Sequence, residues 1–103
     1  MSEQRFSVVT PVGQKPPDDV ALAARPATLD GKVVAEVWDH MYYGDTAFPV
    51  LRDELRRRYP DVEVIDYTNF GNIHGPDEND VVAHLPEELR RRHVDAVVLG
   101  IGN

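Results

Sequence analysis

The fold is decided by the stretch Val94-Asp95-Ala96-Val97-Val98-Leu99-Gly100-Ile101-Gly102-Asn103. It predicts a buried strand over Val94–Leu99 that runs directly into a Gly-x-Gly turn. A strand this apolar is typical of the interior of a parallel sheet, where both faces are covered, rather than of its rim. In open α/β sheets, ligands bind on the loops that follow the carboxyl ends of the strands. Because the sequence stops within such a loop, we expect the chain to be one part of a larger assembly.

Two further strands are predicted upstream, at Val33–Trp38 and Val62–Tyr67. The helix between them should be capped by Asp45 or Thr46 and carry Pro49 in its first turn, where proline is tolerated. Its inward-facing stripe is predicted by helical spacing and consists of Phe48, Leu51 and Leu55.

A second helical region opens at Pro76-Asp77-Glu78, and Pro86 should kink it or split it into two short helices. Strands that alternate with helical segments of this length indicate parallel pairing through right-handed crossovers. We therefore expect an α/β fold with a three-stranded parallel sheet in the order 2-1-3 and one helix on each face. This is half of a flavodoxin-like or Rossmann-like sheet, formed by residues 32–103. Residues 1–31 are rich in proline and should form an extended arm.

The composition narrows the functional classes. At 103 residues the chain is one domain at most, and it contains no cysteine, so a disulfide or a thiolate nucleophile of its own is excluded. A net charge of −7 counts against nucleic acid as a partner. Two runs of arginine, at 56–58 and 90–92, would complement helix dipoles or else bind a phosphate or an acidic partner. Neither a membrane span nor a signal peptide is present, which favours the cytoplasm and no membrane partner.

Three loops should meet at the carboxyl edge of the sheet, at residues 39–45, 68–77 and 100–103. His40 and His74 follow neighbouring strands and are candidates for a general acid and base, with Asp39 as the best catalytic carboxylate. The same three residues could instead ligate a metal, although no local metal-binding spacing supports one, so we expect none. Alternatively, each histidine caps its loop by bonding a backbone carbonyl.

The remaining candidates would bind substrate. Asn69 and Asn72 could orient it through their amides, and Tyr42 and Tyr43 could line a pocket or anchor the first loop on the sheet. Backbone amides near the end of the chain complete the predicted substrate-binding set, at Gly100, Gly102 and Asn103. The Gly-x-Gly element matches only the opening of a dinucleotide fingerprint, so no cofactor is expected.

Three stretches of the chain resemble the UGSC-like family, whose members contain a selenocysteine or cysteine motif. They are Val8–Gly13, Arg25–Lys32 and Val94–Gly102, which match the family's N-terminal proline motif, its lead-in to the first strand and its strand with Gly-x-Gly. The resemblance implies that a Cys/Sec-Gly-Ser/Ala-Cys-Thr motif should follow Asn103, where this sequence ends. The first loop departs from the family pattern at 40–43. The resemblance thus implies an N-terminal half whose cysteine-bearing half is a separate polypeptide.

Three hypotheses for the function follow. The leading one is a small subunit of a heteromeric α/β enzyme with lyase or hydratase chemistry on a small polar molecule, its site shared with the cysteine-bearing subunit that completes the sheet. The second is a non-catalytic module that stabilises or regulates a partner. The third is a homodimer, paired through the edge of the third strand, that binds a small ligand.

Overall fold

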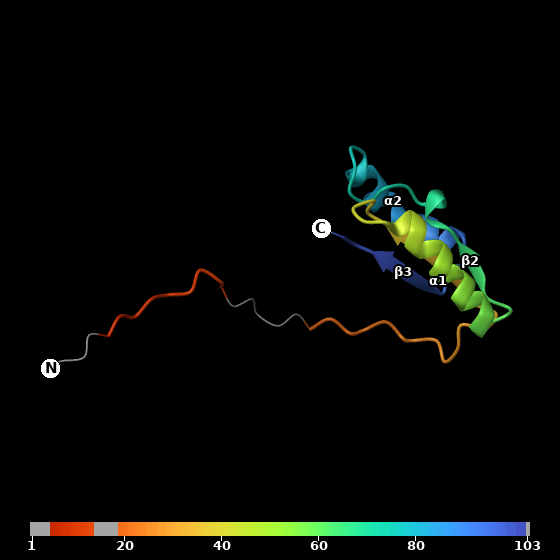
Figure 1. Ribbon diagram of the computed structural model, residues 1–103, viewed down its shortest axis with the longest axis horizontal. Helices are drawn as coiled ribbons and strands as arrows, with labels where there is room; N and C mark the ends of the chain where they lie inside the picture. The colour runs from red at the N-terminus through yellow and green to blue at the C-terminus, as the bar shows by residue number, and fades with distance from the viewer. Residues whose placement is uncertain (1–4, 14–18, 103) are drawn as a thin grey trace.

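The computed structural model describes residues 5–13 and 19–102 and shows a three-stranded parallel sheet (Figure 1). The strands are β1 (Val33–Trp38), β2 (Glu63–Ile65) and β3 (Ala96–Gly100), in the order β2-β1-β3. Both pairings with the central β1 are parallel. The expected α/β class, strand order and strand direction are therefore confirmed, and β1 has the predicted bounds.

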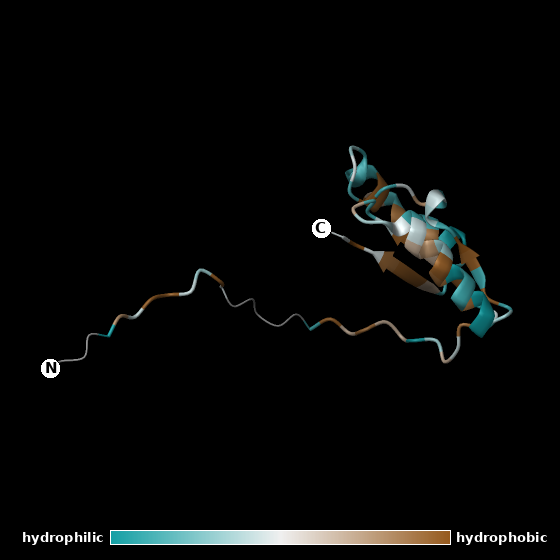
Figure 2. Cartoon of the chain, in the orientation of Figure 1, coloured by the Kyte–Doolittle hydropathy of each residue, from teal (hydrophilic) through white to brown (hydrophobic). Residues whose placement is uncertain are grey.

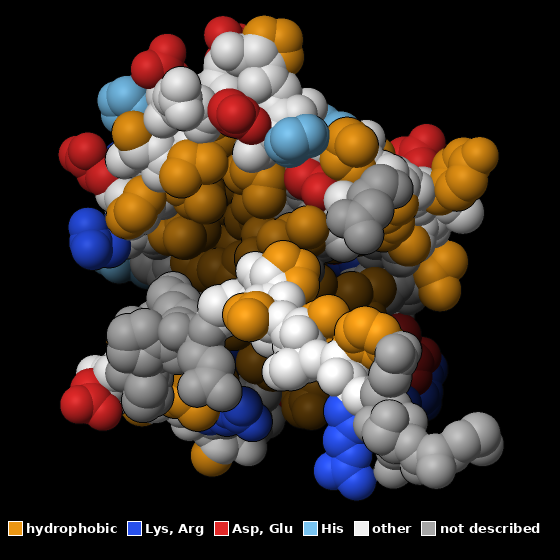
Figure 3. Space-filling view, turned by 90° about the vertical axis from the view of Figure 1, so that its left-hand side faces the viewer, with side chains coloured by type: hydrophobic (Ala, Val, Ile, Leu, Met, Phe, Trp, Pro, Cys, Tyr) orange, Lys and Arg blue, Asp and Glu red, His pale blue; other side chains and the backbone are white. Residues whose placement is uncertain are grey.

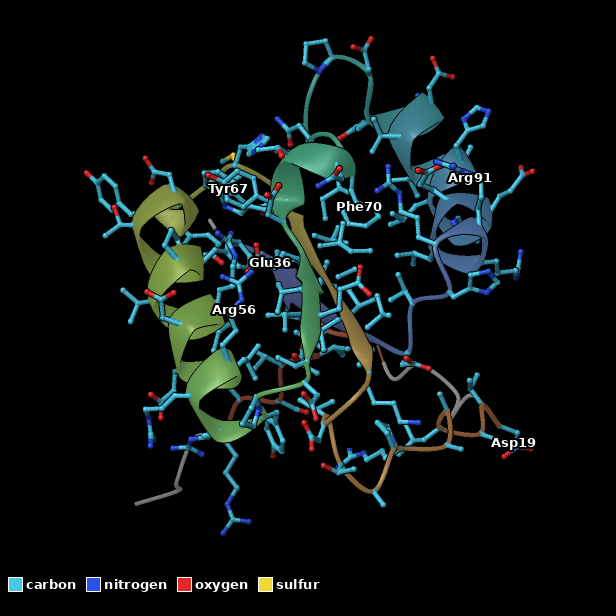
Figure 4. The ribbon with its side chains drawn as sticks, turned by 90° about the vertical axis from the view of Figure 1, so that its right-hand side faces the viewer. Asp19, Glu36, Arg56, Tyr67, Phe70 and Arg91 are labelled. Atoms are coloured by element: carbon cyan, nitrogen blue, oxygen red, sulfur yellow. The ribbon has the colours of Figure 1, made fainter. Side chains whose placement is uncertain are left out.

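One helix covers each face of the sheet, α1 (Gly44–Arg58) and α2 (Glu78–Arg91) (Figure 4). Because successive side chains of a strand point to opposite faces, β1 divides its residues between the two helices. Ala35 and Val37 form a buried cluster with Phe70, against which Leu85 and Leu89 of α2 pack. On the other face, Glu36 and Trp38 face α1, where Arg52 pairs with Glu36 and Phe48 contacts Trp38.

The second and third strands differ from their predicted bounds. Tyr67 does not belong to β2 but begins a 3₁₀ turn, η1 (Tyr67–Asn69), because the carboxylate of Asp66 accepts a hydrogen bond from the Thr68 N–H and turns the chain. The third strand begins two residues later than predicted. The Val94 N–H is bonded to the Leu89 carbonyl at the end of α2, so this residue closes the helix instead of opening the strand.

Both prolines of the helices are accommodated in ways that the sequence analysis did not predict. α1 begins at Gly44, with Tyr43 rather than Asp45 or Thr46 as the N-cap, so Pro49 lies beyond the first turn. α2 continues through Pro86 as one helix, so the predicted split is wrong. A proline leaves the carbonyl four residues earlier without its helical partner. That carbonyl belongs to Val82, whose side chain is exposed, so water can take the place of the missing N–H.

The described part of the N-terminal arm, residues 5–13 and 19–31, contains no helix or strand and extends away from the sheet (Figure 1). Its bulky apolar side chains are exposed, with Phe6 and Val9 at 85% and 93% of their full accessible surface. An extended arm was expected, and it leaves the packing of the sheet to residues 32–102.

Candidate functional site

Three segments meet around the carboxyl end of β1, as expected for a parallel sheet. Trp38, the last residue of β1, is paired with Gly100 of β3 on one side and forms a parallel bridge with Asn72 on the other. The Ile73 N–H also donates to the Trp38 carbonyl at 3.4 Å. The loop after β2 therefore continues the sheet edge beyond the short strand itself and brings Asn72 alongside the start of the first loop.

Asp39 connects two of these segments through its carboxylate. One oxygen accepts the Met41 N–H at 3.0 Å and the other accepts the Gly102 N–H at 2.9 Å. Burial raises the pKa of Asp39, but these hydrogen bonds and the nearby His74 outweigh it, so the net pKa lies below the usual value. The carboxylate is thus ionised at neutral pH, and both oxygens are occupied. This geometry suits a positioning residue better than the predicted catalytic carboxylate.

His40 is folded back onto the sheet by an unusual backbone conformation. Its φ angle of 61° lies in the left-handed region, which costs a non-glycine residue about 1 kcal/mol or more. The imidazole stands edge-on to Trp38, with ring centroids 4.2 Å apart, and 6.2 Å from the Tyr67 ring. The Nε1–H of Trp38 is buried and has no hydrogen-bond partner among the described residues. The strained loop therefore keeps an imidazole against the only tryptophan of the chain.

His74 approaches the same place from the loop after β2. Its backbone N–H donates to the Asn72 side chain at 2.8 Å, and its Nδ1 lies 3.3 Å from a carboxylate oxygen of Glu78 at the start of α2. The imidazole is largely exposed, at 63%. It lies near enough to Asp39 to lower the pKa of that carboxyl. The predicted meeting of the three loops thus places both histidines beside Asp39.

Tyr42 packs over the Gly-x-Gly segment and closes one side of the site. A methyl group placed on Gly100 would collide with the Tyr42 hydroxyl, and one on Gly102 would lie 3.0 Å from the Tyr42 ring. Burial first, and then the carboxylates of Asp39 and Glu36, raise the pKa of Tyr42. The two glycines are therefore required by close packing of this ring.

An open hollow of about 320 Å³ lies over this loop, lined by His40, Met41, Tyr42 and Tyr43. Tyr43 is 85% exposed at the hollow's rim. The prediction that both tyrosines line a pocket agrees with this lining. The hollow is large enough to hold a small molecule against the imidazole of His40.

The other predicted binding residues are used within the chain or lie elsewhere. The Gly102 N–H is bonded to Asp39, so a ligand would have to replace that bond, and the Gly100 carbonyl accepts the Asp39 N–H at 3.1 Å. Asn69 bonds Asp66 through its amide at 3.1 Å and points its oxygen toward Arg92. Asn103 lies outside the described residues. Of the two asparagines, Asn72 is the one whose side chain accepts the His74 backbone N–H.

Tyr67, which was predicted to lie in a strand, is a further residue of the site that the sequence did not reveal. Its ring centroid lies 5.0 Å from that of Trp38 and 5.5 Å from that of Phe48, and Figure 4 shows Tyr67 beside α1. The pattern Asp66-x-Thr68, which is typical of a side-chain-capped turn, could have placed it correctly.

Residues 5–13 and 19–102 contain neither a metal centre nor a helix that could span a membrane. No three His, Asp or Glu side chains lie together there as a metal centre requires. No helix in the described part of the chain has the length and apolar character needed to cross a membrane.

Comparison with known proteins identifies the family. No curated protein and no solved structure matches the chain significantly. The model of the UGSC family matches residues 7–103, which include most of the arm, the whole sheet and all three loops of the site. The chain therefore belongs to the UGSC family.

Proposed function

We propose that the chain supplies the acid–base half of an active site for a small polar molecule, as a subunit of a heteromeric α/β enzyme with lyase or hydratase chemistry. One observation carries the proposal. The carboxylate of Asp39 ties the first loop to the Gly-x-Gly segment at the carboxyl end of the central strand, His40 follows it in the chain, and His74 lies near enough to lower its pKa. Ligands of open parallel sheets bind at this edge.

The two histidines differ in their surroundings, which suits them to different roles. His40 borders the hollow and packs against apolar rings, so it is the group best placed to touch a substrate. His74 is exposed and its Nδ1 lies 3.3 Å from a carboxylate oxygen of Glu78, which orients the ring, so we assign it the role of the acid. Asp39 holds the loops in place, and Asn72 holds the backbone of His74.

Dehydration of a hydroxy acid is a step that this pair could perform. A neutral His40 would take a proton from the carbon next to the carboxylate, and a protonated His74 would give a proton to the departing hydroxyl. The carbon–oxygen bond breaks, a carbon–carbon double bond forms and water leaves, so no oxidant is needed. The thiol of the family motif, which this chain lacks, would come from the partner subunit as the nucleophile or as an additional substrate contact.

The test is activity of the complex purified from the protein's own cells, with a panel of 3-hydroxy acids. Formation of a double bond conjugated with the carboxylate is followed by ultraviolet absorbance. His40→Gln and His74→Gln should each lower kcat by about 10²-fold or more. His84→Gln is the matched control, because His84 is exposed on α2 and bonds only the Asp80 carbonyl of its own helix.

Two results would contradict this function. If the complex dehydrates a hydroxy acid equally well with both histidines replaced, the chain is not the acid–base half. If no member of the panel reacts and none changes the fluorescence of Trp38, which touches His40, then the hollow does not receive this class of molecule. The chain would then be a non-catalytic module.

A further inference from the structure

The exposed apolar side chains of the folded part of the molecule are gathered on one side. Between residues 33 and 102, nine bulky apolar side chains are exposed, and eight of them lie on the first loop, on α1, or on β3 and the residue that follows it. Only Val82, on α2, lies elsewhere. Figure 3 shows orange side chains gathered across the middle of one face of the molecule. A concentration of this kind marks an interaction surface rather than ordinary scattered exposure.

Part of this surface is a groove along α1. It has a volume of about 560 Å³ and is lined by Tyr43, Thr46, Ala47, Val50, Leu51 and Glu54. Leu51 was predicted to face the core, but it is 39% exposed and belongs to this groove. The sheet-facing position is taken instead by Arg52, whose guanidinium binds Glu36.

The groove opens toward β3. The pKa of Arg52 is raised first by its hydrogen bond to Glu36 and further by the nearby carboxylate of Asp66, which follows β2. The Arg52 flank of α1 therefore lies on the β2 side. Ala47, Leu51 and Glu54 lie on the opposite flank of the same helix, because helical neighbours repeat every three to four residues. In the order β2-β1-β3, that flank is on the β3 side.

The other face of β3 is also uncovered. Val97 and Leu99 are in register with Ala35 and Val37 of β1, so they point to the face that α2 covers. They are nevertheless 43% and 55% exposed, whereas both β1 residues are fully buried. Figure 2 shows β3 as an apolar strand at the open side of the sheet. Among the described residues, β1 is its only strand partner.

We propose that β3 and the α1 groove together dock one α/β polypeptide, which adds a parallel strand beside β3 and lays an amphipathic helix into the groove. This surface, lined by Val50, Leu51, Val97, Leu99 and Ile101, is called the β3 surface. The proposal depends on packing alone and does not require the acid–base roles of the histidines. It specifies the kind of partner that would complete the site, since parallel sheets are covered by helices on both faces.

A second copy of the chain fits this surface less well. Pairing of β3 with β3 of another copy around a twofold axis would separate the two β1 strands by three strand spacings, or about 14 Å. The two α1 helices would be at least as far apart, because each leans toward its own β2. Packed helices are 8–10 Å apart, so the grooves would stay open. Val97 and Leu99 would stay uncovered on the other face.

The N-terminal arm is also a poorer occupant. Residues 5–13 and 19–31 carry exposed apolar side chains, and their extended backbone could pair with the edge of β3. They contain no helix, however, that could fill the groove. An occupant that satisfies the edge and both faces at once needs helices as well as a strand.

The experiment uses a photoreactive benzophenone side chain in place of Val50, or in place of Leu99, in the full chain within its own cells. Mass spectrometry of the cross-linked peptides should show both positions joined to one polypeptide, at two different segments of it, with position 50 joined to a predicted amphipathic helix. The matched control replaces Val82, which is similarly exposed but lies on α2, and it should not join to that polypeptide.

A second measurement guards against loss of folding. Val50→Asp should raise the Kd of the complex with the cross-linked polypeptide by about tenfold or more, whereas Val82→Asp should change it by less than about twofold. Both variants should keep the far-ultraviolet circular dichroism spectrum of the parent protein. Cross-links from position 50 or 99 to another copy, to residues 5–31 or to unrelated polypeptides would overturn the proposal, and so would the absence of any cross-link. Because catalysis is not measured, failure here is separate from failure of the acid–base proposal.

Discussion

The ion pair between Glu36 and Arg52 offers a sharp test of how the fold holds α1 above the site. Glu36 is 1% exposed in the middle of the central strand, and the Arg52 side chain is 19% exposed. The guanidinium donates two hydrogen bonds, at 2.7 and 3.3 Å, one to each carboxylate oxygen. Replacing Arg52 by methionine keeps much of the side chain's packing but leaves a buried carboxylate without its partner. Removing one partner of a buried pair costs about 3–5 kcal/mol.

Water reaches part of the Arg52 guanidinium, so we expect a value near the lower end of that range. Arg52→Met should reduce the free energy of unfolding by about 3 kcal/mol. In urea, where a chain of this size loses roughly 1 kcal/mol of stability per molar denaturant, the midpoint should fall by about 3 M. The transition can be followed by circular dichroism at pH 7.

Two further variants decide whether burial is the cause. Arg57→Met removes an exposed arginine of the same helix, which pairs with Glu54, and it should leave the midpoint almost unchanged because exposed pairs contribute little. Replacing Glu36 and Arg52 together by leucine should recover much of the lost stability, since no unpaired charge remains. If Arg52→Met shifts the midpoint no more than Arg57→Met, or if the double variant is no better than Arg52→Met, the reasoning is refuted.

Three other predictions concern the site and α1. Gly100→Ala should reduce the free energy of unfolding by about 1–3 kcal/mol, because the new methyl group displaces the Tyr42 hydroxyl. The same displacement should lower the pKa of Tyr42 toward its ordinary value, which absorbance titration measures. Gly13→Ala is the control, because a methyl group there would have nothing within 4 Å. Asp39→Asn has one carbonyl oxygen for two N–H donors, so hydrogen exchange at Gly102 or at the other donor should accelerate about tenfold or more. Hydrogen bonds from Arg57 and Arg58 lower the pKa of Glu54 to about 2. Its ionised form therefore stabilises the fold above about pH 4.5, and this gain is lost as the pH falls through about 2. Glu54→Gln should flatten the dependence of the free energy of unfolding on pH between those values, and an unchanged dependence would contradict the pairing.

The topology was predictable from the sequence because it depends on the order and type of the elements. Residues 33–38 form a short apolar run between turn signals, and the helical segments on either side of residues 62–65 have the length of crossovers. The order of the strands follows from right-handed connections. The ends of the elements depended on single hydrogen bonds, such as the Asp66 bond that stops β2 and the Leu89 bond that delays β3. Periodicity carries no information about such bonds.

Prolines and caps were the weakest part of the prediction, for a related reason. Pro86 was expected to kink or split its helix, but the cost of such a proline depends on whether the freed carbonyl can reach water. Exposure is a property of the packed structure, not of the residue. The same applies to Leu51, which fits the helical stripe but is displaced by Arg52 because a buried glutamate on β1 requires a cation opposite it.

The candidate site was predictable in its location and only partly in its members. Asp39, His40 and His74 gather at the sheet edge because parallel strands all end there. The left-handed conformation of His40, which turns its ring onto Trp38, could not be read from the residue type. Tyr67 was missed because it reaches the site only through the turn that Asp66 forms.

The candidate site and the β3 surface meet at three consecutive residues, 100–102, so a change on the β3 surface can reach the site. Gly100 packs under Tyr42 and Gly102 donates to Asp39, while Ile101 between them is 67% exposed on the β3 surface. A polypeptide that covers Ile101 would therefore act on a backbone segment whose neighbouring N–H is bonded to the central carboxylate. Asp39 in turn fixes the loop that bears His40 through the Met41 N–H. Docking and catalytic geometry would thus be coupled through one short chain of hydrogen bonds, so the loop conformation that positions His40 would change with docking.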